Sequence, residues 1–166
     1  MKTTAAALLL ALSGCSGASS DSPSLNIADR DFITDSVAHL RVDLAAVQDA
    51  AGSLDPSQAQ VVREFARLTE AELDALSDMA DRDDVMVPDL AEALKHVEDV
   101  EQHSAPQTVG PTVPDQLAES SEGALARARS HLERGRHEEL RGIAERMVVE
   151  REKLRSALGA GQAADE

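Results

Sequence analysis

Apolar residues recur at every third or fourth position along most of this chain, and that spacing predicts amphipathic helices. The recurrence runs from about residue 28 to residue 158, and no stretch alternates convincingly in the manner of a half-buried strand. The first continuous stripe consists of Ile33, Val37, Leu40, Leu44 and Val47. The pattern therefore predicts an all-α fold.

Turn and cap residues divide the pattern into five predicted helices. Gly52 is expected to end the first helix, and Asp55 with Pro56 supplies an N-cap and a first-turn proline for the second. Pro88 is expected to open a shorter third helix in the same way. The predicted ranges are about 28–51, 56–81, 88–102, 114–134 and 138–158.

The connections between these helices predict how they assemble. A short loop joins the first pair, and another at Gly135 joins the last pair, so each pair is expected to form a hairpin. The breakers Pro106, Gly110 and Pro111 mark a long connection between the two hairpins. Two repeated hairpins plus a short connecting helix predict an antiparallel four-helix bundle of the ferritin-like kind over residues 28–158, followed by a disordered tail at 159–166.

The N-terminus has the features of an export signal. Lys2 precedes an apolar run over residues 5–12, which is too short for the roughly 20 residues that a membrane span needs. Residues 12–15, with the letters LSGC, resemble a bacterial lipobox, in which the cysteine is acylated after cleavage. The alternative is an ordinary secretory peptide with a chance cysteine, which we consider the weaker interpretation because Cys15 is the only cysteine and stands at the expected position. We expect a signal peptide at 1–14 and, at 15–27, lipidated Cys15 with a serine-rich tether.

This interpretation predicts an exported protein whose partner is a membrane, held through the lipid on Cys15. Ser16 follows the cysteine and favours the periplasmic face of the outer membrane in a bacterium with two membranes. In a bacterium with one membrane, the same anchor places the protein on the outer face of the cell membrane.

Charge and composition exclude some partners. The chain has 31 acidic and 16 basic side chains, a net charge of −15 that becomes −16 once residues 1–14 are removed. This excess argues against nucleic acid, whose binding depends on Lys and Arg. Phe32 and Phe65 are the only aromatic rings besides histidine, so a stacking platform for bases is not expected. The oligomeric state and the identity of any protein partner stay open.

Histidines and acids are spaced for a metal ion in two places. Asp35, His39 and Asp43 are one turn apart on one helical face and have the residue types to share an ion. A second set suits a hard or borderline divalent ion: Glu92, His96, Asp99 and His103. In both places the simpler interpretation is a solvated helix face. His131 and His137 are expected to be surface or capping residues.

Catalytic motifs are missing from the sequence. A ferritin-like di-iron centre requires Glu-x-x-His, which does not occur, and there is no nucleophile elbow, phosphate-binding glycine loop or His-Glu-x-x-His. We therefore expect a protein that is not an enzyme and has no required cofactor.

The last predicted helix carries charges of both signs. Arg141 with Glu145, and Arg146 with Glu150, have the spacing of surface ion pairs. Arg151 interrupts the apolar stripe, where it either extends to the surface, pairs with an acid inside the bundle, or marks a partner surface.

Several segments form a pattern that can be compared with known families: Asp29-Arg30-Asp31-Phe32-Ile33, His39, Ala124-Leu125-Ala126-Arg127-Ala128, and Leu132-Glu133-Arg134-Gly135-Arg136-His137-Glu138-Glu139-Leu140-Arg141-Gly142-Ile143-Ala144. Together they resemble a bacterial exported family, domain of unknown function three-hundred-and-five. Residues 144–151 also resemble a sister family, domain of unknown function four-one-four-two. The resemblance implies a ferritin-like fold, and some members of the first family are associated with copper or silver handling.

The resemblance also marks positions where the family usually has a methionine, a histidine pair and a second methionine. Soft ligands of these kinds suit Cu(I) or Ag(I). The residues at these positions here are Ser36, His39-Leu40 and Ala46 in the first half, and Leu117, Ser120-Ser121 and Arg127 in the second. One ligand of about eight is present, so we expect a lipid-anchored envelope protein with a non-catalytic binding or accessory role. The alternative is a copper-type metal-binding or resistance protein with a degenerate site.

Overall fold

A computed structural model describes residues 24–50, 56–101 and 113–162. In these ranges the chain forms five helices and no strands: α1 (Ile27–Ala50), α2 (Pro56–Arg82), α3 (Leu90–Glu101), α4 (Val113–Arg134) and α5 (Glu138–Gln162). The all-α prediction is confirmed. The predicted signal peptide, Cys15 and the start of the tether lie outside the described residues. Among the helices that are described, none is both long enough and apolar enough to cross a membrane.

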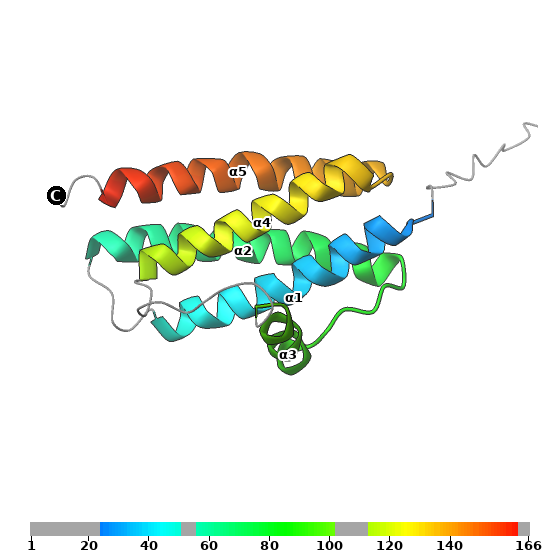
Figure 1. The fold of residues 1–166 in the computed structure, drawn as a ribbon, viewed down its shortest axis with the longest axis horizontal. Helices are drawn as coiled ribbons and strands as arrows, with labels where there is room; N and C mark the ends of the chain where they lie inside the picture. Colours follow the sequence, from blue (N-terminus) through cyan, green and yellow to red (C-terminus); the bar gives the residue numbers. More distant parts are fainter. Residues whose placement is uncertain (1–23, 51–55, 102–112, 163–166) are drawn as a thin grey trace, which may run out of the picture.

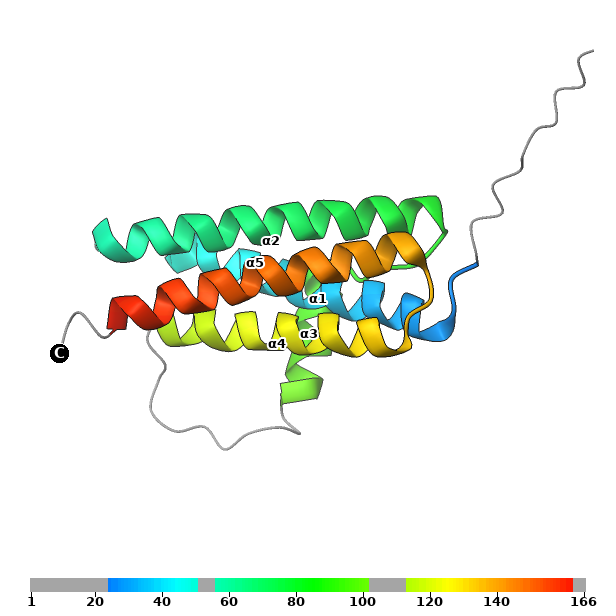
Figure 2. The same ribbon diagram turned by 90° about the horizontal axis from the view of Figure 1, so that it is seen from above.

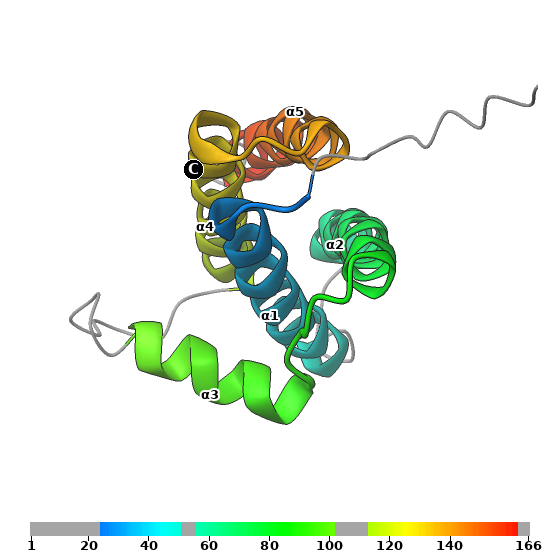
Figure 3. The same ribbon diagram turned by 90° about the vertical axis from the view of Figure 1, so that its right-hand side faces the viewer.

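The four long helices lie side by side, and α3 crosses them (Figure 1). α1 packs against α2 and α4, and α5 packs against the same two helices, so that the four long helices surround a shared core (Figure 2). α3 is seen end-on in Figure 1 and lengthwise in Figure 3, and it packs against α1. The molecule is thus a helical bundle with a short helix laid across one face.

The start of α3 differs from the prediction. The helix begins at Leu90, because Asp89 and Glu92 form a reciprocal capping box: the Glu92 N–H donates to Asp89 Oδ1 (2.9 Å) and the Asp89 N–H donates to Glu92 Oε2 (3.3 Å). Pro88 stays outside the helix, where its carbonyl accepts a hydrogen bond from Arg41 Nη1 on α1. A stronger cap one residue later therefore overrides the proline signal.

The end of α5 also differs from the predicted range. The helix continues past Leu158 to Gln162, so the predicted tail contributes four residues to it. Ala157 and Ala160 have high helix propensity, which offsets the cost of the two glycines nearby. Residues 163–166 lie outside the described part.

Two separate clusters of apolar side chains make up the core. One cluster lies toward the α4–α5 turn and includes Phe32, Ile33, Val37, Leu40, Leu76, Met79, Leu140, Ile143 and Met147. The other lies toward the opposite end and consists of Val47, Val62, Phe65, Leu68, Leu117, Leu154 and Leu158. On α2 and α5, the buried polar residues Thr69, Glu72 and Arg151 stand between members of the two clusters.

The carboxylate of Asp29 ties the start of α1 to the start of α5. It is fully buried, and its Oδ2 accepts from the Asn26 N–H (2.9 Å), completing a capping box with Asn26 Oδ1. Its Oδ1 accepts from the backbone N–H groups of Arg136 (3.0 Å) and His137 (3.3 Å). These N–H groups precede α5 and have no carbonyl partner within that helix, so one side chain caps two helices.

Two histidines at this end of the bundle are buried, so their predicted surface position is wrong. His131 is 2% exposed and His137 is 6% exposed. The His131 ring stacks on Phe32 with ring centroids 4.3 Å apart, and its Nε2 lies 3.8 Å from Asp29 Oδ1. Burial lowers the pKa of His131, although Asp29 opposes this shift. The capping prediction for His137 agrees with its place just before α5, where its carbonyl accepts the Arg141 N–H (3.0 Å).

The predicted ion pairs along α5 do not form. Arg141 Nη1 donates instead to the carbonyls of Leu132 (2.5 Å) and Gly135 (3.3 Å), which are left without helical partners at the end of α4. Glu150 pairs with Lys153 at 2.8 Å. For Arg141, carbonyl acceptors at the end of α4 thus replace Glu145, whereas Glu150 pairs with another neighbour on its own helix.

Gly135 and Gly142 make a matched pair of glycines for one test. A Cβ on Gly135 would lie 2.1 to 2.5 Å from three ring atoms of His131, whereas a Cβ on Gly142 would meet only Arg146 Nη1 at 3.7 Å. Gly135→Ala is expected to lower the free energy of unfolding by about 2–3 kcal/mol through overpacking. Gly142→Ala, in the interior of α5, is expected to raise it by about 0.5–1 kcal/mol. Urea unfolding followed by circular dichroism measures both, and equal effects would contradict the close approach at Gly135.

Candidate functional site

Thr69, Glu72 and Arg151 form a polar layer between the two apolar clusters. Arg151 on α5 is fully buried, and its guanidinium donates to Glu72 on α2 from Nε (3.0 Å) and from Nη2 (2.5 Å). Nη2 also donates to Thr69 Oγ1 (3.0 Å), and the guanidinium carbon lies 4.8 Å from the centroid of the Phe65 ring. Of the three roles considered for Arg151, pairing with an acid inside the bundle is the one the structure confirms.

Phe65, which contacts Arg151, also lines a cavity between α1, α2, α3 and α4. The cavity measures about 370 Å³, a size within the usual range for small-molecule sites. Its apolar wall includes Val42, Val47, Phe65, Val97 and Leu117. Its polar lining comprises His39, Asp43, Gln116, Glu119, Ser120 and Arg127. Apolar walls with a few convergent polar groups are typical of binding sites.

Arg127 is the unusual member of this lining. Its Nε is enclosed and has no hydrogen-bond partner, and nowhere in the described part of the chain does its guanidinium form an ion pair. Asp43 attracts it, yet burial outweighs that attraction and lowers the pKa of Arg127. The carboxylate of Asp43 is instead bonded to the Ser120 hydroxyl, and burial raises the pKa of Asp43. The cavity therefore holds a partly buried cation whose Nε has no acceptor among the described residues, although the carboxylates of Asp43, Asp35 and Glu72 act on it at longer range.

His39 is partly buried and faces the same cavity. Desolvation, aided by the positive charge of Arg127 and by His96, lowers the pKa of His39 from 6.5 to about 4. The simpler interpretation of His39 as a solvated surface residue does not match this position. At neutral pH the imidazole is uncharged, with a nitrogen lone pair available as acceptor or ligand.

The lowered pKa of His39 predicts how acid affects stability. Because the folded pKa lies below the unfolded value of 6.5, the stabilising contribution is present above pH 6.5 and is lost as the pH falls toward 4. The wild-type chain is expected to lose more stability between pH 7 and pH 4.5 than His39→Gln. Urea unfolding at both pH values measures this difference, and the raised pKa values of Asp43 and Glu72 cancel because both proteins contain these acids. An NMR titration midpoint of His39 near 6.5 would contradict the prediction.

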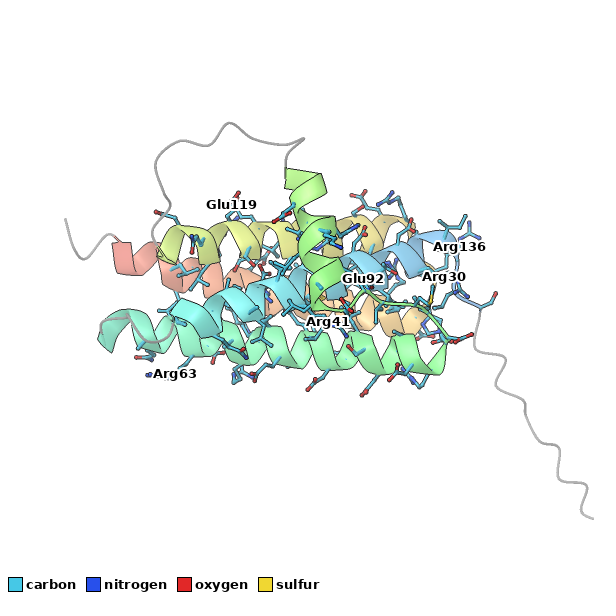
Figure 4. All side chains as sticks on the ribbon, turned by 90° about the horizontal axis from the view of Figure 1, so that it is seen from below. Arg30, Arg41, Arg63, Glu92, Glu119 and Arg136 are labelled. Atoms are coloured by element: carbon cyan, nitrogen blue, oxygen red, sulfur yellow. The ribbon has the colours of Figure 1, made fainter. Side chains whose placement is uncertain are left out.

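The structure brings part of the two predicted metal sets together. His96 Nε2 on α3 lies 3.3 Å from Asp35 Oδ1 on α1, and its ring centroid is 6.4 Å from that of His39. Glu92 is occupied by the capping box with Asp89, and Figure 4 places it where α3 crosses α1. The side chain of Asp99 and all of His103 lie outside the described residues. Across the described ranges, no group of three or more His, Cys, Asp or Glu side chains has the arrangement to hold a metal ion.

The positions marked by the family resemblance converge on this cavity. His39 and Ala46 from α1, and Leu117, Ser120 and Arg127 from α4, all line it. Ser36 and Ser121, at two further marked positions, are buried with hydroxyl groups that have no hydrogen-bond partner. Five of the marked positions therefore lie around one cavity. The sequence alone presents Arg127 there only as a residue that replaces a ligand of the family.

Substitution of Arg127 tests directly whether its charge in the cavity destabilises the folded protein. Arg127→Met removes a partly buried charge whose Nε has no acceptor among the described residues, and it keeps an unbranched side chain that reaches about as far as Nε, so the free energy of unfolding is expected to rise by about 1 kcal/mol. Arg63→Met is the control, because Arg63 is exposed on α2 and lies on the opposite side of the molecule from Glu119 at the cavity edge (Figure 4). Thermal unfolding measures both variants. A loss of stability in Arg127→Met would show that Arg127 is a structural residue.

No family model, curated protein or solved structure matches this chain.

Proposed function

We propose that this protein is a lipid-anchored component of the bacterial envelope whose helical domain binds a ligand without catalysing a reaction, and that the cavity is the binding site. The observation that carries this proposal is the enclosed Nε of Arg127, which has no hydrogen-bond partner among the described residues, in a cavity lined by both apolar and polar side chains. Such a group lowers the stability of the free protein, and destabilising groups of this kind are found mainly at functional sites. A bound ligand supplies the missing partner.

Within this proposal, the four long helices form an antiparallel, ferritin-like bundle built from two hairpins. In support, α1, α2, α4 and α5 pack in a closed cycle, and the colour gradients of neighbouring long helices run in opposite directions in Figure 1. The polar layer and the cavity then occupy the middle of the bundle.

Binding at the cavity is tested with the small-molecule fraction extracted from bacterial envelopes. The extract is expected to slow backbone hydrogen exchange in residues 39–47 and 116–127 of the wild-type chain. Ala46→Trp is the control, since Ala46 is an exposed residue of the lining and a large ring there fills the mouth of the cavity. If no fraction protects these segments, or if Ala46→Trp is protected equally, the cavity is not a binding site.

The anchor is tested separately from the cavity. We propose that lipid on Cys15 holds the chain at the periplasmic face of an outer membrane or, in a bacterium with one membrane, on the outer face of the cell membrane. The support is the lipobox-like segment at residues 12–15 and the serine-rich segment that follows. Cys15→Ser is expected to lose both acyl mass and membrane partitioning. A variant that keeps both would overturn the anchor.

A metal-binding role is the second candidate, favoured by the approach of His96 to Asp35 and His39. Calorimetric titration with Cu(I), Cu(II) and Zn(II) tests it. A submicromolar site that is abolished by His39→Ala or His96→Ala would establish this role and overturn the proposal of a metal-free binding protein.

A further inference from the structure

The cavity combines three properties that together select a ligand. It contains the cation Arg127, whose enclosed Nε lacks an acceptor within the described part of the chain. It has apolar lining residues from α1, α2, α3 and α4, among them Val42, Phe65, Val97 and Leu117. It also carries acids, Asp43 inside and Glu119 at the exposed edge, which disfavour a ligand of high negative charge.

The guanidinium of Arg127 sets the chemistry of the polar end of the ligand. Its planar N–H groups match the two oxygens of a carboxylate, and a charge-assisted pair of this kind is stronger inside an apolar cavity than in water. The acids nearby and the net charge of −15 repel phosphate monoesters and dicarboxylates more than a single carboxylate. His39 faces the cavity without adding a positive charge at neutral pH.

The walls set the chemistry of the other end. The apolar side chains come from four helices and leave about 370 Å³, which suits a compact ring or branched chain and not a long acyl chain. Burial of apolar ligand surface against them supplies affinity that does not depend on charge.

We infer that the cavity binds a small monocarboxylate with a compact apolar body, whose carboxylate pairs with Arg127 and whose body lies against Val42, Phe65, Val97 and Leu117. This inference rests on the proposed binding function of the cavity and specifies its ligand class. Binding converts Arg127 from an unpartnered charge into a buried ion pair, which relieves the instability that the free protein carries.

The test uses the full chain carrying Cys15→Ser, titrated with benzoate and 4-methylpentanoate as probes. Benzamide, benzylamine and phthalate are the neutral, cationic and dianionic counterparts of benzoate. Both monocarboxylates are expected to bind, and benzamide, benzylamine and phthalate at least about tenfold more weakly than benzoate. Benzamide has no charge to pair with Arg127, benzylamine has the same sign of charge as Arg127, and phthalate brings a second negative charge close to Asp43 and Glu119. Isothermal titration calorimetry gives the affinities. The NMR signal of the Arg127 Nε–H group is expected to shift with benzoate and not with benzamide.

Two variants test whether the charge of Arg127, and not that of an arginine elsewhere, is needed to bind the carboxylate. Arg127→Met is expected to weaken benzoate by at least about tenfold and to leave benzamide unchanged, whereas Arg63→Met is expected to bind both as the wild type does. Equal affinities for benzoate and benzamide, or benzoate binding that survives Arg127→Met, would overturn the ligand class. If the carboxylates do not bind while envelope extract still protects residues 39–47 and 116–127, the ligand class is wrong and the binding function stands. If neither binds, both proposals fail.

Discussion

Glu72→Met is expected to lower the free energy of unfolding by about 3–5 kcal/mol, because it leaves the guanidinium of Arg151 buried without an anion. Arg151 is fully buried, and its side chain donates to Glu72 and Thr69. An arginine does not lose its charge in a folded protein, so the loss persists at every pH that the fold tolerates. Urea unfolding monitored by circular dichroism measures the effect.

Removal of the arginine instead of the acid is expected to lower the free energy of unfolding less at low pH than at neutral pH. In Arg151→Met the remaining carboxyl is Glu72, whose pKa burial raises even beside Arg151. Without the arginine this carboxyl accepts a proton more readily, because neutralisation removes the buried charge. Arg151→Met is therefore expected to be destabilised less at pH 5 than at pH 7, relative to the wild type.

The double variant and a surface variant complete the test of the polar layer. Glu72→Met with Arg151→Met replaces the whole pair by apolar side chains, and such replacements are often neutral or stabilising. Its stability is expected to lie far above that of Glu72→Met. Glu70→Met, at an exposed position on the same helix, is expected to stay within about 0.5 kcal/mol of the wild type. A double variant as unstable as Glu72→Met would contradict the pairing.

Asp29→Ala is expected to have the second largest effect, a loss of about 2–4 kcal/mol in the free energy of unfolding. The substitution removes an acceptor shared by the N–H groups of Asn26, Arg136 and His137, at the starts of two helices. Helix caps contribute about 0.5–2 kcal/mol each, and buried donors left without a partner add to the loss. Denaturant unfolding gives the total.

The segments that lose protection from hydrogen exchange in Asp29→Ala distinguish this residue from an ordinary helix cap, which would affect one helix only. Hydrogen exchange is expected to accelerate at residues 136–141 as well as at residues 26–32, because the carboxylate joins the two segments. Asp31→Ala, at an exposed position two residues along, is expected to change neither segment. An effect of Asp29→Ala confined to the start of α1 would contradict the contact with α5.

Helix positions were predictable from the sequence because they depend on local signals. The stripe from Ile33 to Val47 and the proline at the start of α2 indicated those two helices to within one residue at each end. The start of α3 was harder, since Pro88 and the Asp89–Glu92 pair are competing signals a residue apart and only the second carries a reciprocal pair of hydrogen bonds.

The cavity was less predictable because contacts between distant segments create it. Whether His39 faces solvent or a cavity depends on where α3 crosses α1, and the spacing of apolar residues does not contain this information. The burial of His131 has a similar origin. Its ring stacks on Phe32 from α1 and lies against Gly135 in the α4–α5 turn, and neither residue signals a histidine partner by itself.

The Arg151–Glu72 pair also restricts how the helices can slide past one another. On α5 the arginine stands between Met147 and Leu154, and each of these belongs to a different apolar cluster. Moving α5 along its axis by one turn, about 5.4 Å, would carry the charge into one of those clusters and leave Glu72 opposite an apolar side chain. The small buried side chains of Ala38, Ala80, Ala124, Ala128 and Ala144 specify a single alignment only weakly by shape. The buried ion pair thus fixes how α5 is aligned with α2. Packing of the small side chains alone would not select one alignment.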